Sequence, residues 1–315
     1  FSVFSSCLFP ARSTCARVFA RGRNKLTRRK ILCSDREMEH FDGIFLNAVK
    51  LLEAGDFHEA TVAGGSAYAT VGRRDLRKAI PCCALLSKAY FRLDDRLRAN
   101  MYLSEALSMC KRDPFDTELA NAAIFSVMAE LYELLGDKAG EEQMLLEYLH
   151  RMKRIVGDEH VATSDCYHLL AGFYVRHADL SNAIVSAEKS CNIRVAHGGL
   201  ENELSAQSLY TLGLIYRLAG NLEKASKAFL DAVAARTACF GPSSLEVAEA
   251  QISAGFTAQQ TEQVPLASQM YEQAFATRSA VLGPENKATI EAFTLLDFLR
   301  HKGVTTPQKN IQKIR

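Results

Sequence analysis

This sequence of 315 residues contains no tryptophan. Its cysteines show none of the spacings that hold a metal ion or form a redox pair. The nine cysteines are odd in number and scattered, as is typical of reduced thiols that fill a protein core. No phosphate-binding glycine loop, dinucleotide-binding glycine pattern or His-Glu-x-x-His zinc motif occurs. The nearest cluster of ligand-type residues, His160 with Cys166 and His168, lacks a fourth ligand. We therefore expect a protein without catalytic residues, cofactor or metal.

Long apolar runs are also missing: no stretch approaches 18 consecutive apolar residues, so we expect no transmembrane helix. Acidic residues are missing from residues 1–34, which carry eight basic side chains. The remaining chain holds 30 basic and 36 acidic residues, a formal charge of −6. A mildly acidic body argues against a nucleic-acid-binding surface, which is normally basic.

Residues 1–40 form a predicted N-terminal extension rich in serine and arginine. A basic, acid-free segment with apolar residues such as Phe4 and Phe19 is typical of a mitochondrial transit segment. Three alternatives stay open: the chain, which does not begin with methionine, is a fragment or a processed form; Phe1–Phe9 is the remnant of a secretory signal; or Met38 is the true start. We expect a mitochondrial location, with a cytoplasmic or ciliary location as the alternative.

The extension contains a basic arm, which consists of Arg21, Arg23, Lys25, Arg28, Arg29 and Lys30. Such a run also fits contact with RNA phosphates or anionic lipid. No aromatic residue is interleaved with these bases, so the targeting interpretation is the stronger one.

The most informative feature that is present is a repeat with a period of 42 residues. Three residue types keep this step: Gly157, Gly199, Gly241 and Gly283; Tyr90, Tyr132, Tyr174 and Tyr216; and Arg194, Arg236 and Arg278. Small residues keep the same frame at Ala129, Ala171, Gly213 and Gly255, and at Ala99, Ala183, Ala225 and Ala267. Small residues at such points let two helices approach closely. Gly55, Gly136 and Gly220 lie between the two segments of their units, where glycine ends a helix, so each unit is predicted to be a helix, a turn and a helix.

One unit carries a recognisable consensus, which consists of Leu212-Gly213, Tyr216, Gly220, Ala225, Phe229 and Ala232. In this register the unit resembles the tetratricopeptide repeat. The resemblance implies an all-α, right-handed superhelical solenoid. Six units are predicted to begin near Phe41, Ile80, Ala122, Ser164, Ala206 and Ala248, followed by a capping helix at 288–302. The solenoid then spans residues 41–302, and residues 303–315 form a short basic tail.

The repeat length refines this resemblance. A step of 42 residues, with Leu-Gly-Pro-Glu at 282–285, resembles the kinesin light chain variety more than the common 34-residue form. The paired asparagines with which that family grips a peptide backbone are replaced by Tyr210 and Thr211 in the best unit. The resemblance therefore does not extend to that mechanism of cargo binding.

The same resemblance implies a concave groove lined by the first helix of each unit. The residues expected to face it are Lys88, Arg92, Glu130, Glu133, Arg176, Tyr210 and Arg217. They form a surface of mixed charge with one aromatic anchor, which suits a helical or extended peptide.

From these observations we expect a non-catalytic scaffold for protein–protein interaction. Its role is predicted to be that of a structural or accessory subunit, docked through the groove and the N-terminal arm on a larger assembly in the mitochondrion. The alternative is a cytosolic or ciliary adaptor of kinesin-light-chain type that links cargo to a motor or to microtubules.

Overall fold

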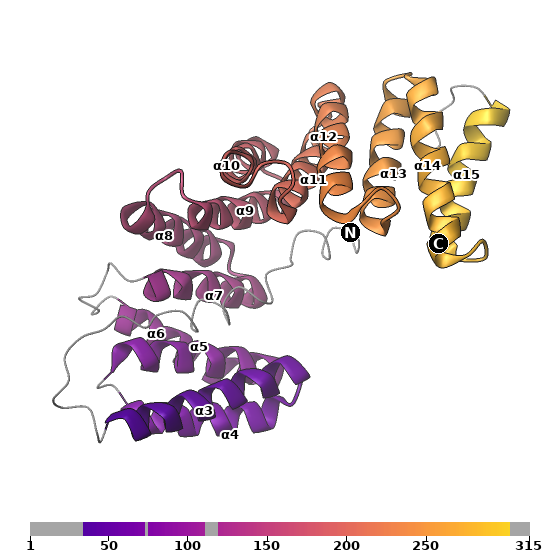
Figure 1. The fold of residues 1–315 in the computed structure, drawn as a ribbon. Helices are drawn as coiled ribbons and strands as arrows, with labels where there is room; N and C mark the ends of the chain where they lie inside the picture. Colours follow the sequence, from indigo (N-terminus) through magenta and orange to yellow (C-terminus); the bar gives the residue numbers. More distant parts are fainter. Residues whose placement is uncertain (1–33, 73–74, 111–118, 303–315) are drawn as a thin grey trace. The chain divides into compact units, whose positions relative to one another are not determined.

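The computed structural model describes residues 34–72, 75–110 and 119–302, and within these residues all regular structure is helical (Figure 1). The predicted all-α class is confirmed. Residues 1–33 of the predicted extension 1–40, which include the basic arm, and the tail 303–315 lie outside the described residues, whereas residues 34–40 belong to the first described helix. The helices are α3 (Ser34–Ala54), α4 (Phe57–Val71), α5 (Leu76–Arg92), α6 (Arg96–Cys110), α7 (Leu119–Leu135), α8 (Lys138–Val156), α9 (Val161–Arg176), α10 (Leu180–Gly198), α11 (Glu203–Leu218), α12 (Leu222–Phe240), α13 (Leu245–Gln260), α14 (Val264–Leu282) and α15 (Lys287–Lys302).

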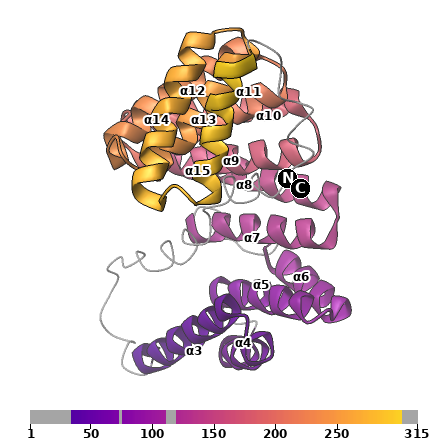
Figure 2. The ribbon, with the colours of Figure 1, turned by 90° about the vertical axis from the view of Figure 1, so that its right-hand side faces the viewer.

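Successive helices pack in pairs, α3 with α4 and so on to α13 with α14, and α15 covers α14 (Figures 1 and 2). Among the described helices, successive pairs are also in contact: α4 contacts α5, α6 contacts α7, α10 contacts α11, and α12 contacts α13. The described helices divide into two compact units, α3–α8 up to Asp158 and α9–α15 from Glu159. We call them the N-terminal and the C-terminal unit. No described helix is long and apolar enough to cross a membrane.

Polar caps that recur with the repeat fix the starts of six helices, α8 to α13. His160, Asn202 and Ser244 each precede a first helix and accept a hydrogen bond from its first turn. Asp137, Asp179 and Asn221 do the same for second helices. Because these caps satisfy amide groups that have no partner within the helix, they set its first residue. The capped first helices α9, α11 and α13 consequently begin three residues before the predicted starts of their units, and α3, α5 and α7 begin three to seven residues before theirs.

Within the C-terminal unit, small residues admit aromatic rings between the paired helices. A Cβ atom at Gly213 would lie 2.7 Å from the ring of Phe229, and one at Gly255 would lie 2.7 Å from the ring of Tyr271. Both rings are fully buried. The recurring small residues are therefore the places where the second helix of a pair inserts its ring against the first.

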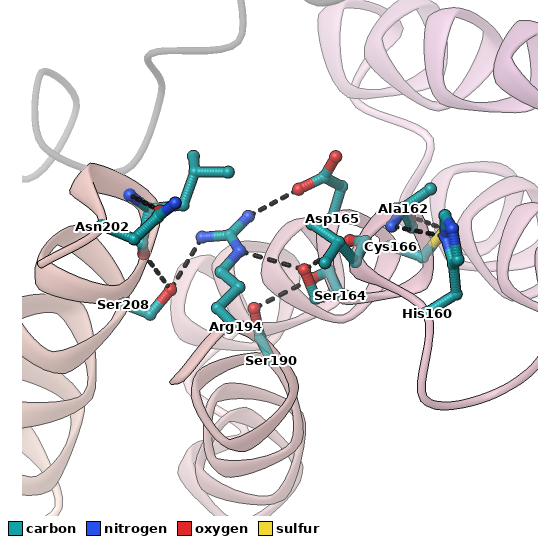
Figure 3. Close-up of polar contacts among 11 residues, drawn as sticks. His160, Ala162, Ser164, Asp165, Cys166, Ser190, Arg194, Asn202 and Ser208 are labelled. Carbon is teal, nitrogen blue, oxygen red and sulfur yellow. Dashed lines mark hydrogen bonds and ion pairs between the residues drawn. The ribbon is translucent and has the colours of Figure 1, made fainter. Parts of the chain in front are cut away.

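The recurring arginines tie the second helices of the C-terminal unit to the first helices beside them. Arg194 on α10 donates to Ser164 Oγ on α9 at 3.0 Å and to Ser208 Oγ on α11 at 2.7 Å, and it pairs with Asp165 at 2.7 Å (Figure 3). Because its guanidinium reaches both neighbours, it fixes α9, α10 and α11 together.

The two later arginines act in the same way. Arg236 on α12 donates to the carbonyl oxygen of Glu246 at 2.6 Å and to the carboxylate of Glu249 at 2.9 Å, both on α13. Arg278 on α14 reaches the carbonyl oxygen of Ala288 at 2.8 Å on α15. The equivalent repeat positions in the N-terminal unit are occupied by Cys110 and Met152, and both side chains are buried. The arginine ties are thus a feature of the C-terminal unit.

Candidate partner-binding face

The seven residues predicted to line a groove all lie on first helices. Lys88 and Arg92 are on α5, and Glu130 and Glu133 are on α7, in the N-terminal unit. Arg176 on α9, with Tyr210 and Arg217 on α11, belongs to the C-terminal unit. The predicted set is therefore divided between two units.

In the N-terminal unit, Lys88 and Glu130 are 42 residues apart, and their side chains meet. Lys88 Nζ lies 2.5 Å from Glu130 Oε1, with side chains 25% and 44% exposed. An ion pair of this exposure contributes about 0–1 kcal/mol to stability. Arg92 is exposed at the end of α5, and Glu133 is half-buried one turn beyond Glu130. This face therefore offers a partner one pair that is already neutralised, with a cation near it on α5.

The expectation that Tyr210 is a surface anchor is wrong, because its side chain is only 3% exposed. Its hydroxyl is 3.1 Å from Ser253 Oγ on α13, and the guanidinium of Arg236 lies 4.0 Å above its ring. The ring is thus covered by α12 and α13. Tyr210 contributes to packing between units and to the arginine tie.

Arg217, in the last turn of α11, lies in an unusual environment. Its guanidinium is 5.5 Å from the ring centre of Phe229 and 5.6 Å from that of Phe256. Burial lowers the pKa of Arg217, and the nearby Tyr210 and Tyr271 act in the opposite direction. Among the described residues, no carboxylate pairs with this guanidinium. Arg176, the remaining predicted residue, is exposed at the end of α9.

Gln259 on α13 occupies the position 42 residues after Arg217, and it is not among the residues predicted from the sequence. Its Oε1 accepts a hydrogen bond from the Tyr271 hydroxyl at 3.1 Å. Its Nε2 is buried and has no hydrogen-bond partner in the described part of the chain. Phe256 likewise follows Leu214 by 42 residues. The repeat step applied to Arg217 and Leu214 could have found both residues.

The histidine, cysteine and acidic side chains of the described residues have structural surroundings. They contain no group of three or more histidine, cysteine or acidic residues placed to hold a metal ion. His160, from the suspected cluster, caps α9 by accepting from the Ala162 amide through Nδ1 at 3.1 Å. Burial raises the pKa of Cys82 to about 12 and that of Cys191 to about 11, so neither is an activated thiol.

Comparison with known proteins agrees with the arrangement of the chain in repeated helix pairs. Residues 204–280, which span α11 to α14, match the tetratricopeptide repeat family. No curated protein sequence matches the chain.

Similar solved structures are helical repeat proteins. BtubC (BKLC) from P. vanneervenii is 20% identical, with a TM-score of 0.57 over 75% of this chain and 89% of that chain. A putative kinesin light chain repeat protein from Podospora anserina is 16% identical, with a TM-score of 0.56 over 66% of this chain and 98% of that chain. A signal transduction ATPase with a tetratricopeptide repeat sensor from Pyrococcus horikoshii is 14% identical, with a TM-score of 0.67 over 84% of this chain and 40% of that chain. At these identities the similarity establishes a shared fold of stacked helix pairs.

Proposed function

We propose that this chain, built from tetratricopeptide repeats, is a non-catalytic scaffold that binds other proteins. The observation that carries the proposal is the repeat itself: helix pairs that stack on one another within each unit, with a family match over 204–280. Repeats of this kind contact only their neighbours, and so leave extended faces for partners.

The proposal extends to a role as a structural or accessory subunit of a larger mitochondrial assembly. Its support is the acid-free, basic composition of residues 1–34, which fits an import segment. If the segment is retained after import, it serves as a second point of attachment to that assembly.

The test is to purify the native protein from fractionated cells, to determine its N-terminus by mass spectrometry and to identify proteins that co-purify in stoichiometric amounts. The proposal predicts a mitochondrial fraction and a defined complex. A start at Met38, with cytosolic motor or axonemal proteins as stoichiometric partners, would contradict the mitochondrial role and leave the scaffold function intact.

One observation favours the alternative of a cytosolic or ciliary cargo adaptor of kinesin-light-chain type. The second helices α8, α10, α12 and α14 are each 19 residues long. This length gives the repeat its 42-residue step, the feature in which the chain resembles the kinesin light chain variety. A reporter fused to residues 1–37, compared with one in which the eight basic residues of 1–34 are changed to glutamine, separates the two roles. Import of the first reporter alone supports the mitochondrial role, and cytosolic residence of both supports the adaptor.

A further inference from the structure

We propose that the outer face of α15 is the interface of a homodimer, in which two copies of this chain pair their α15 helices in antiparallel orientation. This inference goes beyond the proposed scaffold function and does not depend on it.

The outer face of α15 exposes apolar side chains at repeat positions that are buried in the preceding helix pairs. Ile290 is 49% exposed, and Phe293 is 50% exposed. The residues at the same two positions of α5, α7, α9, α11 and α13 are at most 8% exposed; they are Ile80, Ala122, Ser164, Ala206 and Ala248 for the first position, and Cys83, Phe125, Tyr167, Leu209 and Gln251 for the second. The last described helix therefore carries residues of an interior type on its surface.

In the preceding pairs this face is covered by the helix that follows. Ser164, at the position of Ile290, accepts hydrogen bonds from Ser190 at 2.9 Å and from Arg194 at 3.0 Å, both on α10. α15 packs on α14 at the end of the C-terminal unit, and no described helix follows it (Figure 1). The exposed face of α15 is thus a face on which the fold elsewhere packs a further helix.

The residues that come next in the sequence lack the side chains of such a packing helix. Lys309 and Lys313 follow Ala267 and Tyr271 of α14 by 42 residues. Ala267 and Tyr271 are fully buried. A lysine at such a position is costly to bury. The repeat therefore does not continue in residues 303–315, and the occupant of the face comes from another chain.

The charges on α15 favour a second copy as that occupant. Lys287, Ile290, Thr294 and Asp297 are all exposed, and they follow one another at steps of three, four and three residues, which places them in one line along the helix. The line is symmetric about position 292. When two α15 helices meet there in antiparallel orientation, Lys287 of each copy lies opposite Asp297 of the other, and Ile290 lies opposite Thr294. One two-fold contact thus covers the apolar residues and forms two ion pairs.

Phe293 extends this contact at its flank. Its ring lies 5.6 Å from that of Phe275 on α14, measured between ring centres. One helix face from each copy is a small interface, so the association should be weak and should depend on protein concentration.

The experiment measures the mass of the full-length chain by sedimentation velocity, under reducing conditions, from about 1 μM to about 300 μM. Two charge reversals, Lys287→Glu and Asp297→Lys, are measured separately and as an equimolar mixture. Ile290→Asp tests the apolar centre of the contact. Val62→Asp is its matched control, because Val62 is an exposed apolar residue of α4. A thermal melt of each variant confirms that it is folded.

We expect the wild-type chain to form a dimer as its concentration rises. Each charge reversal alone should raise the dissociation constant about tenfold, because like charges then face each other at both ends of the contact. The mixture should restore association, because a Lys287→Glu copy and an Asp297→Lys copy place opposite charges at both ends. Ile290→Asp should weaken the dimer by at least about tenfold, and Val62→Asp should leave it unchanged.

A wild-type chain that stays monomeric over this range would overturn the homodimer. Association of a chain shortened to residues 1–302 alone would then identify residues 303–315 as the cover of the face, and a monomer in both forms would leave the face to a different protein. A dimer that the mixture of charge reversals fails to restore would place the interface elsewhere and overturn the antiparallel pairing. The scaffold function stands in each of these cases, because its own test is the identification of co-purifying proteins.

Discussion

One backbone position in each helix pair takes a left-handed conformation, whatever residue occupies it. The position is the turn between the paired helices, and its φ angles are +61° at Asp94, +75° at Gly136, +59° at Ala178, +76° at Gly220 and +60° at Glu262. The five residues are spaced by 42. The fold therefore imposes this conformation, and glycine is the residue that adopts it with least strain.

Exchanging residues at this position should move stability in opposite directions. Ala178→Gly should stabilise the chain by about 0.5–1 kcal/mol, because relief of left-handed strain exceeds the added freedom of the unfolded chain. Gly220→Ala should destabilise it by about 1 kcal/mol for the same reason. Urea unfolding, followed by circular dichroism, measures both variants. A shift of the same sign in the two would show that the turn is not under this strain.

Buried thiols should make the fold sensitive to alkali. Burial raises the pKa of Cys82 to about 12 and that of Cys191 to about 11, whereas an unfolded thiol ionises near pH 9. Their contribution is complete below about pH 9 and is lost as pH rises toward 11, because only the unfolded chain then releases protons. The loss should approach about 1.4 kcal/mol per pH unit for each thiol.

The check is urea unfolding at pH 8, 9 and 10 under reducing conditions, compared with a Cys82→Ala, Cys191→Ala double variant. The variant should lose less stability over this range than the wild-type chain. Equal slopes would assign the alkaline effect to other groups, of which Tyr216 and Tyr271 also have raised pKa values through burial.

At the scale of the helix pair, close approach depends on residues without a side chain. Gly213→Ala should destabilise the C-terminal unit by about 1–3 kcal/mol, because its Cβ would lie 2.7 Å from the ring of the fully buried Phe229. Gly65→Ala on α4 is the control, since no heavy atom lies within 4 Å of its added Cβ. It should stabilise the chain by about 0.5–1 kcal/mol through helix propensity. Thermal unfolding of the two variants tests the contrast, and destabilisation by both would point to a general intolerance of alanine instead.

The helix pairs were predictable because period, small residues and turn glycines are properties of local sequence. Gly55, Gly136 and Gly220 all have the positive φ angles that were expected of them. Asp94, Ala178 and Glu262 were not foreseen at the equivalent turns, because their residue types do not signal that conformation. The helix starts were placed too late, since the caps at His160, Asn202 and Ser244 were not recognised as a series.

The candidate site was less predictable. The position of a residue in the repeat indicates the helix face on which it lies, but not which residues of the neighbouring helices cover it. Tyr210 stands at a groove position in the frame, yet Arg236 and Ser253 enclose it. Lys88 and Glu130 were expected separately, and they neutralise each other. The setting of Arg217 between two rings depends on Phe256, one helix pair further along the chain. These contacts form only when the helices are stacked, so the spacing of the residues in the sequence does not predict them.

At the scale of the whole chain, the two compact units should differ in stability. The C-terminal unit has the arginine ties of Arg194, Arg236 and Arg278 and a buried core cluster that runs through α9 to α14. The N-terminal unit has Cys110 and Met152 in the same frame. Because repeats derive stability from their own cores and nearest neighbours, we expect residues 159–315 to fold alone as a cooperative helical fragment.

The measurement is thermal and guanidinium unfolding of fragments 34–158 and 159–315 beside the full chain. The C-terminal fragment should unfold at a higher denaturant concentration than the N-terminal fragment and match the later part of the full-chain transition. A third fragment, 180–315, is the control, because removing α9 deprives Arg194 of Ser164 and Asp165 and exposes the core against which α9 packs. It should lose stability relative to 159–315. If the fragment 159–315 is unfolded while the full chain is stable, the two units depend on each other, and the arginine ties are not sufficient to hold the second one.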